Sequence, residues 1–196
     1  MNWVERIMEA VGSRRDPQGP GWEQVEAELG VTLPADFKEL SARFGDGSFS
    51  DYLILLQPNA DQGLTPLLSM WSTALRQTRV DPLGARWYEP YEYYAPETGQ
   101  GLIPWGYDII EGNYFWLADR SVEAERWPVI AQKEGEACLR FDIAAAEFLH
   151  RMLTNPEFKP FTVADPPRLP FWVPPSAPYP LSDEEREALS SPNRAD

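Results

Sequence analysis

The chain has 196 residues, and its 31 acidic residues against 17 basic ones give a formal net charge of −14. This balance disfavours generic binding to nucleic acid, whose phosphates reward Lys and Arg. Hydrophobic residues make up 43% of the chain and the mean hydropathy is −0.44, so a sizeable core is possible, while no apolar run approaches the roughly 20 residues that span a bilayer. The charge fits either simple solubility or steered association with a basic partner.

The N-terminal segment and the cysteine content indicate a reducing compartment. Residues 1–12 are charged and amphipathic and lack the apolar centre of a signal peptide. Cys138 is the single cysteine, so no internal disulfide can form. We therefore expect a cytoplasmic protein.

The first half of the chain reads as helices joined by short breaks. A first helix is expected over residues 2–12, and a linker rich in Pro and Gly follows at 13–21. Two short amphipathic helices come next, and Gly30 and Gly45 follow them where helices end in a left-handed cap. Pro34 suits the first helical position of the second one. The apolar residues at helical spacing are Trp22, Val25 and Leu29, then Phe37, Leu40 and Phe44.

This ordered pattern resembles the SUKH superfamily, whose members include bacterial immunity proteins and a fungal regulator of cell-wall synthesis. The residues that carry the resemblance are Trp22, Glu26, Leu29, Gly30, Leu33, Pro34, Asp36, Phe37, Phe44, Gly45, Gly47 and Phe49. Further along, residues 101–119 resemble the central hairpin of the family, and residues 127–153 resemble its closing strand and C-terminal helix. The resemblance covers roughly residues 20–153.

The middle of the chain alternates strand patterns with proline-rich breaks. Residues 51–56 read as a strand buried on both faces, and Thr65 as the N-cap of a helix that runs to about Arg79 with Leu68, Trp71 and Leu75 buried. Residues 80–104 contain several prolines and are expected to form a long loop.

The second half reads as a hairpin, two more strands and a helix. The hairpin is expected to pair residues 107–110 with 114–117 around a turn at 111–113, in which Gly112 and Asn113 tolerate positive φ. Strands at 126–131 and 137–141 follow. Asp142 is the expected cap of a helix over residues 143–153.

The C-terminal part is a separate, proline-rich extension. Residues 155–180 hold nine of the 20 prolines together with several large aromatic residues, which disordered tails usually lack. We expect a SUKH-like α+β domain at 1–154 with helices on a mostly antiparallel sheet of about four to six strands. The extension at 155–196 should be ordered and strapped across that domain, with a short helix at 183–190 and frayed residues from about Ser191.

No combination of residues points to catalysis, a metal or a cofactor. His150 is the only histidine and lacks the partners of a triad or a metal site, so a role in packing or on the helix surface is expected. Cys138 reads as a small buried hydrophobe rather than a nucleophile. No glycine-rich phosphate-binding motif is present, and the many carboxylates make a hidden glycosidase pair only a weak inference. We therefore expect a protein that is not an enzyme.

One segment stands out as a candidate surface for a basic protein partner. Residues 87–119 contain six acids and no Lys or Arg, interleaved with aromatic residues. Acids steer and select a basic partner, and Tyr and Trp bury much area at low entropic cost. Trp105, Phe115 and Trp116 are expected in the core, whereas the loop tyrosines fit binding and packing equally. The candidate partner-binding residues are Asp46, Asp51, Glu89, Tyr91, Glu92, Tyr93, Tyr94, Glu97, Asp108 and Glu111.

The resemblance implies an immunity protein that binds and neutralises a cognate bacterial toxin, often a nuclease or a deaminase. An acidic inhibitor can cover the basic cleft of such an enzyme. The alternative is a regulatory scaffold or peptide-binding module of the same fold, in which the Pro-rich extension fills a groove or serves as a ligand. The sequence leaves the oligomeric state open.

Overall fold

The computed structural model describes residues 2–12, 21–59, 66–161, 170–175, 177 and 181–190. Its helices are α1 (Trp3–Ala10), α2 (Glu23–Leu29), α3 (Ala35–Phe44), α4 (Leu67–Val80), α5 (Pro82–Ala85), α6 (Ala145–Thr154) and α7 (Asp183–Ser190), with the 3-10 helices η1 (Arg86–Tyr88) and η2 (Ala124–Arg126). Its strands are β1 (Ser48–Phe49), β2 (Leu53–Leu55), β3 (Gln100–Asp108), β4 (Asn113–Asp119), β5 (Val129–Gln132), β6 (Leu139–Phe141) and β7 (Trp172–Val173).

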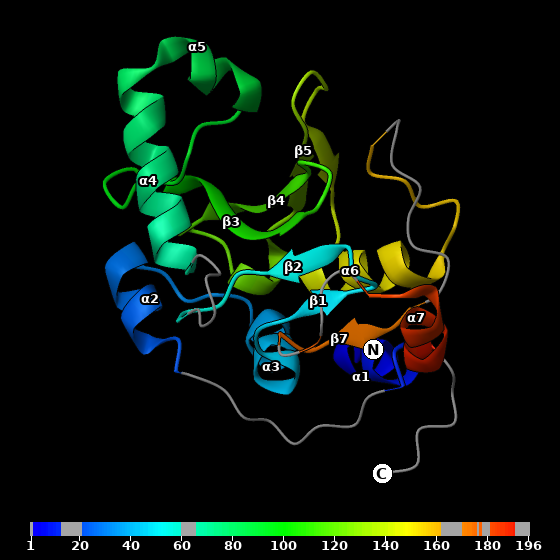
Figure 1. Ribbon diagram of the computed structural model, residues 1–196. Coiled ribbons are helices and arrows are strands. Elements are labelled where there is room, and N and C mark those ends of the chain that lie inside the picture. Colours follow the sequence, from blue (N-terminus) through cyan, green and yellow to red (C-terminus); the bar gives the residue numbers. More distant parts are fainter. Residues whose placement is uncertain are drawn as a thin grey trace.

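The strands form one antiparallel sheet in the order β6-β5-β4-β3-β2-β1-β7. Helices α1, α3 and α6 pack on one another below the sheet, whereas α4 lies beside β3 and α5 packs on α4 (Figure 1). The predicted α+β class is confirmed. The sheet has seven strands, more than expected, because β1 and β2 are separate strands and the C-terminal segment adds β7.

The two early helices meet at the predicted corner. Gly30 follows α2 with a φ of 68°, the left-handed cap that glycine adopts readily. The Glu26 carboxylate spans the corner, since Oε1 accepts from the backbone N–H of Leu33 at 2.8 Å and from Lys38 Nζ at 2.7 Å. Pro34 lies one residue earlier than predicted, at the N-cap of α3.

Phe37 of α3 lies at the centre of the core. Its ring centroid is 4.7 Å from that of Trp116, 5.7 Å from Trp22 and 6.1 Å from Trp105, and all four side chains are buried. These rings join the helix corner to β3 and β4. The prediction that Trp105, Phe115 and Trp116 belong to the core is confirmed.

The opposite face of the sheet is covered by η1 and the segment after it. Side chains alternate along a strand, so Phe115 points away from the face that carries Trp116. The Phe115 ring lies 5.9 Å from Tyr88 and 5.7 Å from Tyr93. Residues 86–95 therefore contribute to a second layer of the core.

The expectation of a long loop over residues 80–104 is wrong in part. Asp81 caps α5 by accepting from the backbone N–H of Leu83 at 3.0 Å, and Pro82 occupies its first turn. At the other end, β3 begins at Gln100 and contains Pro104 at a register shift against β4. Proline is tolerated in a strand at such a bulge. The presence of prolines in this region therefore does not exclude a strand.

The strand predicted at 51–56 is shorter and begins with a turn. Ser50 and Asp51 have φ values of 56° and 53°, and the N–H of Tyr52 donates to the carbonyl of Phe49 at 3.0 Å. This tight turn connects β1 to β2 and restricts the strand to Leu53–Leu55, where Ile54 is only half-buried. Of the helix that follows, Leu67 and Trp71 are buried, while Leu68 and Leu75 are half-buried; Thr65 lies outside the described residues.

The last domain helix is capped from a distant residue. Asp142 was expected at its N-cap, but that position belongs to Ala144, and Asp142 instead pairs with Arg140 at 2.8 Å. Asp36 of α3 accepts from the backbone N–H of Ala146 at 3.3 Å, and burial raises the pKa of the Asp36 carboxyl. One of the unpaired N–H groups at the start of α6 is thus satisfied by α3 rather than by its own segment.

Described parts of the C-terminal extension contact the sheet. Trp172 and Val173 of β7 pair with Phe49 and Ser48 of β1, and the Trp172 side chain is buried. Helix α7 follows the predicted capping box, in which Ser182 and Glu185 bond reciprocally. Residues 162–169, 176, 178–180 and 191–196, including the predicted frayed end, lie outside the described residues, and the division into domains at 154 stays a prediction.

Within the described part of the chain, every helix is too short or too polar to cross a lipid bilayer.

Candidate functional site

The loop over residues 89–97 runs between η1 and β3, beside α4 (Figure 1). Its backbone is fixed to the start of β3: the carbonyl of Glu92 accepts from Leu102 N at 2.8 Å, and Tyr94 N donates to the carbonyl of Leu102 at 3.0 Å. A further bridge pairs Ala95 with Gln100. The acidic side chains of this loop therefore project from a backbone with a defined position.

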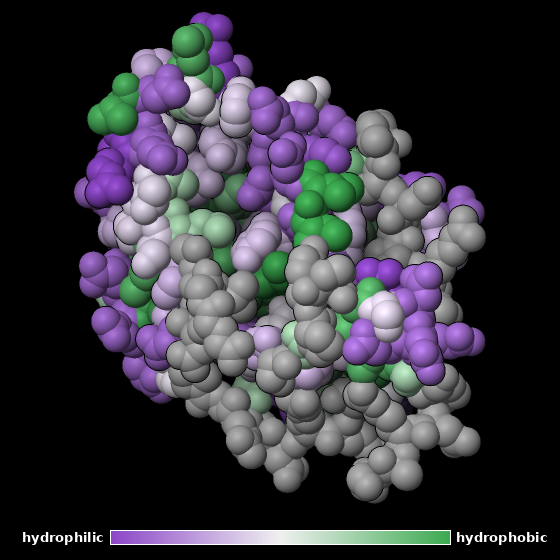
Figure 2. Space-filling view, in the orientation of Figure 1, coloured by the Kyte–Doolittle hydropathy of each residue, from purple (hydrophilic) through white to green (hydrophobic). Residues whose placement is uncertain are grey.

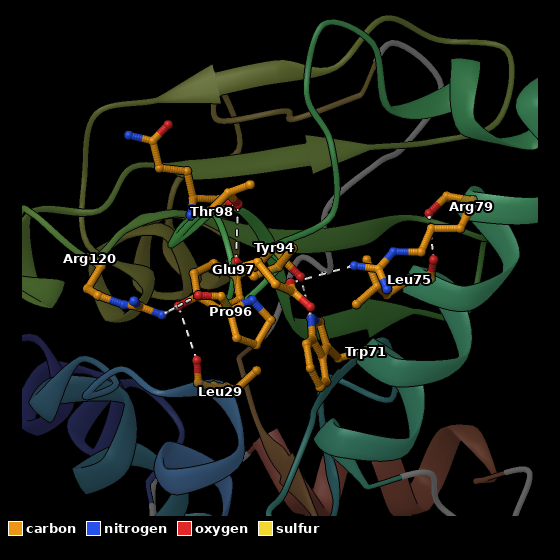
Figure 3. A network of polar contacts seen from close by, with 12 residues as sticks. Leu29, Trp71, Leu75, Arg79, Tyr94, Pro96, Glu97, Thr98 and Arg120 are labelled. Carbon is orange, nitrogen blue, oxygen red and sulfur yellow. Dashed lines mark hydrogen bonds and ion pairs between the residues drawn. The ribbon is translucent and has the colours of Figure 1, made fainter.

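Tyr94 joins this loop to two helices (Figure 3). Its hydroxyl donates to the carbonyl of Leu29 at the end of α2, at 3.1 Å, and its own carbonyl accepts from Trp71 Nε1 of α4, at 3.0 Å. Arg120 Nη2 donates to the Tyr94 hydroxyl at 3.4 Å and to the carbonyl of Pro96 at 2.6 Å. Through these contacts Tyr94 links the loop to α2 and α4.

Burial corrects the expectation for two of the three loop tyrosines. Tyr94 is fully buried, and Tyr93 is buried with its ring centroid 4.9 Å from that of Tyr88. Burial raises the pKa of the Tyr93 hydroxyl, with Tyr88 as a second cause. Tyr91 is half-buried and packs against the core. Of the three, only Tyr91 keeps a partly exposed side chain that a partner can contact.

The acids of the loop are exposed, but basic residues from elsewhere approach them. Glu89, Glu92 and Glu97 are exposed. Glu97 Oε2 lies 3.7 Å from Arg79 Nη2, and more than half of each side chain is accessible, so this pair contributes little and can be exchanged for another. Among the described residues, no ion pair involves Glu89 or Glu92. The base-free stretch seen in the sequence is thus flanked in space by Arg79 and Arg120.

The remaining candidate residues lie at the other end of β3. That strand runs from Gln100 to Asp108, about 25 Å at roughly 3.3 Å per residue. The β1–β2 turn and the β3–β4 turn are neighbours there, since Ile109 N donates to the carbonyl of Tyr52 at 3.1 Å. The structure therefore divides the predicted surface into two groups, the loop at 89–97 and a turn region that includes Asp51, Asp108 and Glu111.

Asp108 is buried and fixes the turn from inside. Its Oδ2 accepts from the hydroxyls of Tyr52 at 3.0 Å and Tyr114 at 2.6 Å, and its Oδ1 accepts from the backbone N–H groups of Ile110 at 2.9 Å and Gly112 at 2.8 Å. The prediction placed Asp108 on the contact surface; its burial and these four donors show an internal role in this conformation instead. The turn has its positive φ at Glu111, 73°, rather than at the predicted Gly112 or Asn113.

Other members of the turn region have intramolecular partners or remain exposed. Asp51 Oδ2 lies 3.3 Å from Arg186 Nη2 of α7, and the Asp51 side chain is only 14% exposed. Asp46 is half-buried, whereas Glu111 is exposed. The exposed candidates across both groups are therefore Glu89, Glu92, Glu97 and Glu111, with Tyr91 partly exposed.

Reactive side chains show no activated geometry. The His150 ring packs at a tilt against Trp3, with ring centroids 5.2 Å apart, and burial, followed by the charge of Arg6, lowers the pKa of its imidazole. Cys138 precedes β6 rather than lying in a strand; it is half-buried, and burial raises the pKa of its thiol. Within the described ranges, no group of three or more His, Cys, Asp or Glu side chains is arranged to hold a metal ion.

Tyr94→Phe is expected to lower the free energy of unfolding by about 1–2 kcal/mol, because the buried carbonyl of Leu29 loses its donor. Amide hydrogen exchange in residues 93–97 should quicken, and chemical denaturation measures the stability. Tyr91→Phe is the matched control, since its hydroxyl lies on a half-buried side chain of the same loop. Equal exchange and equal stability in both variants would show that Tyr94 does not tie the loop to α2.

Comparison with known proteins gives one match. Residues 21–144 match the family model SUKH_6, described as SMI1-KNR4 cell-wall. The match extends from just before α2 to just before α6, and it includes the helix corner and both groups of candidate residues. No curated protein and no solved structure matched the chain.

Proposed function

The chain belongs to the SMI1-KNR4 family, and from this we propose that it is a non-enzymatic, immunity-type protein that binds and neutralises a cognate bacterial toxin in the cytoplasm. Membership supports a protein-interaction or immunity-type domain in general. The toxin as partner, and its basic character, are the specific part of the proposal.

The observation that carries this proposal is the exposed acidic loop on a fixed backbone. Glu89 and Glu92 form no ion pair among the described residues, and Glu97 has only the exposed pair with Arg79. The chain adds a long-range field, since its net charge is −14. A negative field of this kind increases the association rate with a basic protein. Exposed acids on a fixed backbone then favour a partner whose basic groups match their positions. A basic nuclease or deaminase cleft fits this chemistry.

Co-expression with a toxin-like gene found beside the gene for this chain tests the proposal. The wild-type chain should rescue growth, and the triple variant Glu89→Lys, Glu92→Lys, Glu97→Lys should fail to rescue while keeping its circular dichroism spectrum. The triple variant Glu5→Lys, Glu9→Lys, Glu28→Lys changes the net charge equally at exposed helix positions and should still rescue. Equal loss in both variants would indicate a field effect without a localised surface.

A regulatory scaffold is the second candidate, favoured by the position of β7. This segment pairs with the outer edge of β1, which is how an added peptide strand binds a sheet in β-augmentation. In this case the sheet edge would serve peptide binding and the C-terminal segment would occupy it. Absence of rescue with every neighbouring toxin-like gene would favour this function.

A further inference from the structure

Three large apolar side chains lie exposed together at the end of α4 and on α5 and η1. Val80 is 77% exposed, Leu83 71% and Trp87 51%. Figure 2 shows green side chains among purple ones over this part of the molecule, at the upper left. Clustered exposed apolar residues of this size commonly mark a protein interface, and Trp is enriched among the residues that dominate binding energy.

These side chains border a groove of about 480 Å³ between α4 and the α5–η1 segment. Ala74, Gln77 and Thr78 line it from one face of α4, and Val80 and Asp81 line it where α4 ends. Trp71, Leu75 and Arg79 form a different stripe of α4, which faces the loop at 89–97 (Figure 3). The groove and that loop thus lie on separate flanks of α4.

The charges beside the groove differ from those of the chain as a whole. Arg76, Arg79 and Arg86 are the only basic residues between positions 44 and 119, and all three are exposed. Within residues 76–89 they accompany two acids, Asp81 and Glu89. Bases therefore outnumber acids here although the net charge of the chain is −14. A surface with both signs, such as Arg76 and Arg86 beside Asp81, can match a second copy of itself.

We propose that this face is the interface between two copies of the chain, related by a two-fold axis. Leu83 of each copy enters the groove of the other, Trp87 packs beside it, and Arg76 and Arg86 of one copy face Asp81 of its partner. A two-fold contact uses the same patch on both copies and so requires such self-complementarity. The flank of α4 that holds residues 93–97 stays outside this contact.

Light scattering coupled to size-exclusion chromatography of the full chain tests this interface. The wild-type chain should show twice the 22.3 kDa mass of one copy. Leu83→Glu and Trp87→Glu should each raise the dimer dissociation constant by about 30-fold or more, as loss of a central apolar contact does. Ile109→Glu is the matched control, because Ile109 is 55% exposed at the other end of β3, and it should leave the dimer intact.

Several outcomes would overturn the proposal. A wild-type chain that stays monomeric at its solubility limit has no such interface, and a dimer broken by Ile109→Glu but not by Leu83→Glu has its interface elsewhere. The double variant Arg76→Glu, Arg86→Glu tests the charge pairing, because it should weaken a dimer that depends on mixed charges. If it leaves the dimer dissociation constant unchanged, these arginines do not face acids of a second copy, and the proposed interface is wrong.

Discussion

Phe37→Ala is expected to lower the free energy of unfolding by about 3–5 kcal/mol, the usual cost of removing a buried phenyl ring. Phe37 is fully buried, and its ring contacts Trp22 before α2, Trp105 in β3 and Trp116 in β4. The cavity left by alanine would be lined by rigid indole rings that cannot collapse into it easily. Chemical denaturation of the purified variant measures the loss.

The control for this variant is an aromatic ring that lies outside the core. Trp87→Ala removes a larger side chain, yet Trp87 is half exposed, so at protein concentrations where the chain is monomeric the free energy of unfolding should change by less than about 1 kcal/mol. If Phe37→Ala behaves like Trp87→Ala, the helix corner is not the centre of the core. The denaturation midpoints of the two variants decide this directly.

The helix corner could be predicted because its signals are local. Trp22, Val25 and Leu29 share a helical face, and Gly30 supplies a left-handed cap within the same few residues. Each signal acts through the backbone of its own segment, so neighbouring residues suffice to infer the structure. The capping box of α7 at Ser182 and Glu185 was predictable for the same reason.

Features that depend on distant residues were not predictable from their own segments. The start of α6 is bonded by Asp36, which lies over a hundred residues earlier. Pro82, Pro90 and Pro96 predict a loop over residues 80–104, and only the pairing with β4 shows that β3 begins at Gln100 and accommodates Pro104 at a bulge. β7 is two residues long and is defined as a strand only by its pairing with β1.

For the candidate surface, the sequence predicts which residue types are present but not which residues lie next to one another in space. The concentration of acids in residues 87–119 is visible in the sequence, and the exposure of Glu89, Glu92 and Glu97 agrees with it. The sequence offers no sign that Arg79 and Arg120 approach the loop, or that Tyr94 links it to α2. The neighbouring residues in the sequence also do not indicate whether an apolar residue such as Leu83 lies in the core or at the surface.

Asp108→Ala is expected to destabilise the chain by about 3–5 kcal/mol, because it leaves several buried donors without an acceptor. The hydroxyls of Tyr52 and Tyr114 and the N–H groups of Ile110 and Gly112 all donate to this one carboxylate. The packing around the carboxylate is tight: a Cβ on Gly112 would lie 2.2 Å from Asp108 Oδ2 and 2.6 Å from a ring carbon of Phe161. Urea denaturation gives the free energy, and hydrogen exchange at the 108–113 turn gives its location.

Two companion variants separate the network from simple loss of an acid. Asp108→Asn keeps one carbonyl oxygen for the two N–H groups, and its amide can donate to the tyrosine oxygens, so it should cost about half as much as alanine. Glu111→Ala removes an exposed acid of the same turn and should be nearly neutral. If Asp108→Ala matches Glu111→Ala, the buried carboxylate does not hold the turn.

The alkaline limb of the stability curve supplies an independent readout of the same network. Burial, followed by the Asp108 charge, raises the pKa of Tyr52 and of Tyr114 above the ordinary tyrosine value of 10.0. A folded-state pKa above the unfolded value stabilises the fold below pH 10, and this contribution is lost as the pH rises above 10. Wild-type stability should therefore fall steeply above pH 10, and in the double variant Tyr52→Phe, Tyr114→Phe it should start lower and fall less steeply. Parallel alkaline slopes in the two proteins would mean that these hydroxyls are not held protonated by the buried site.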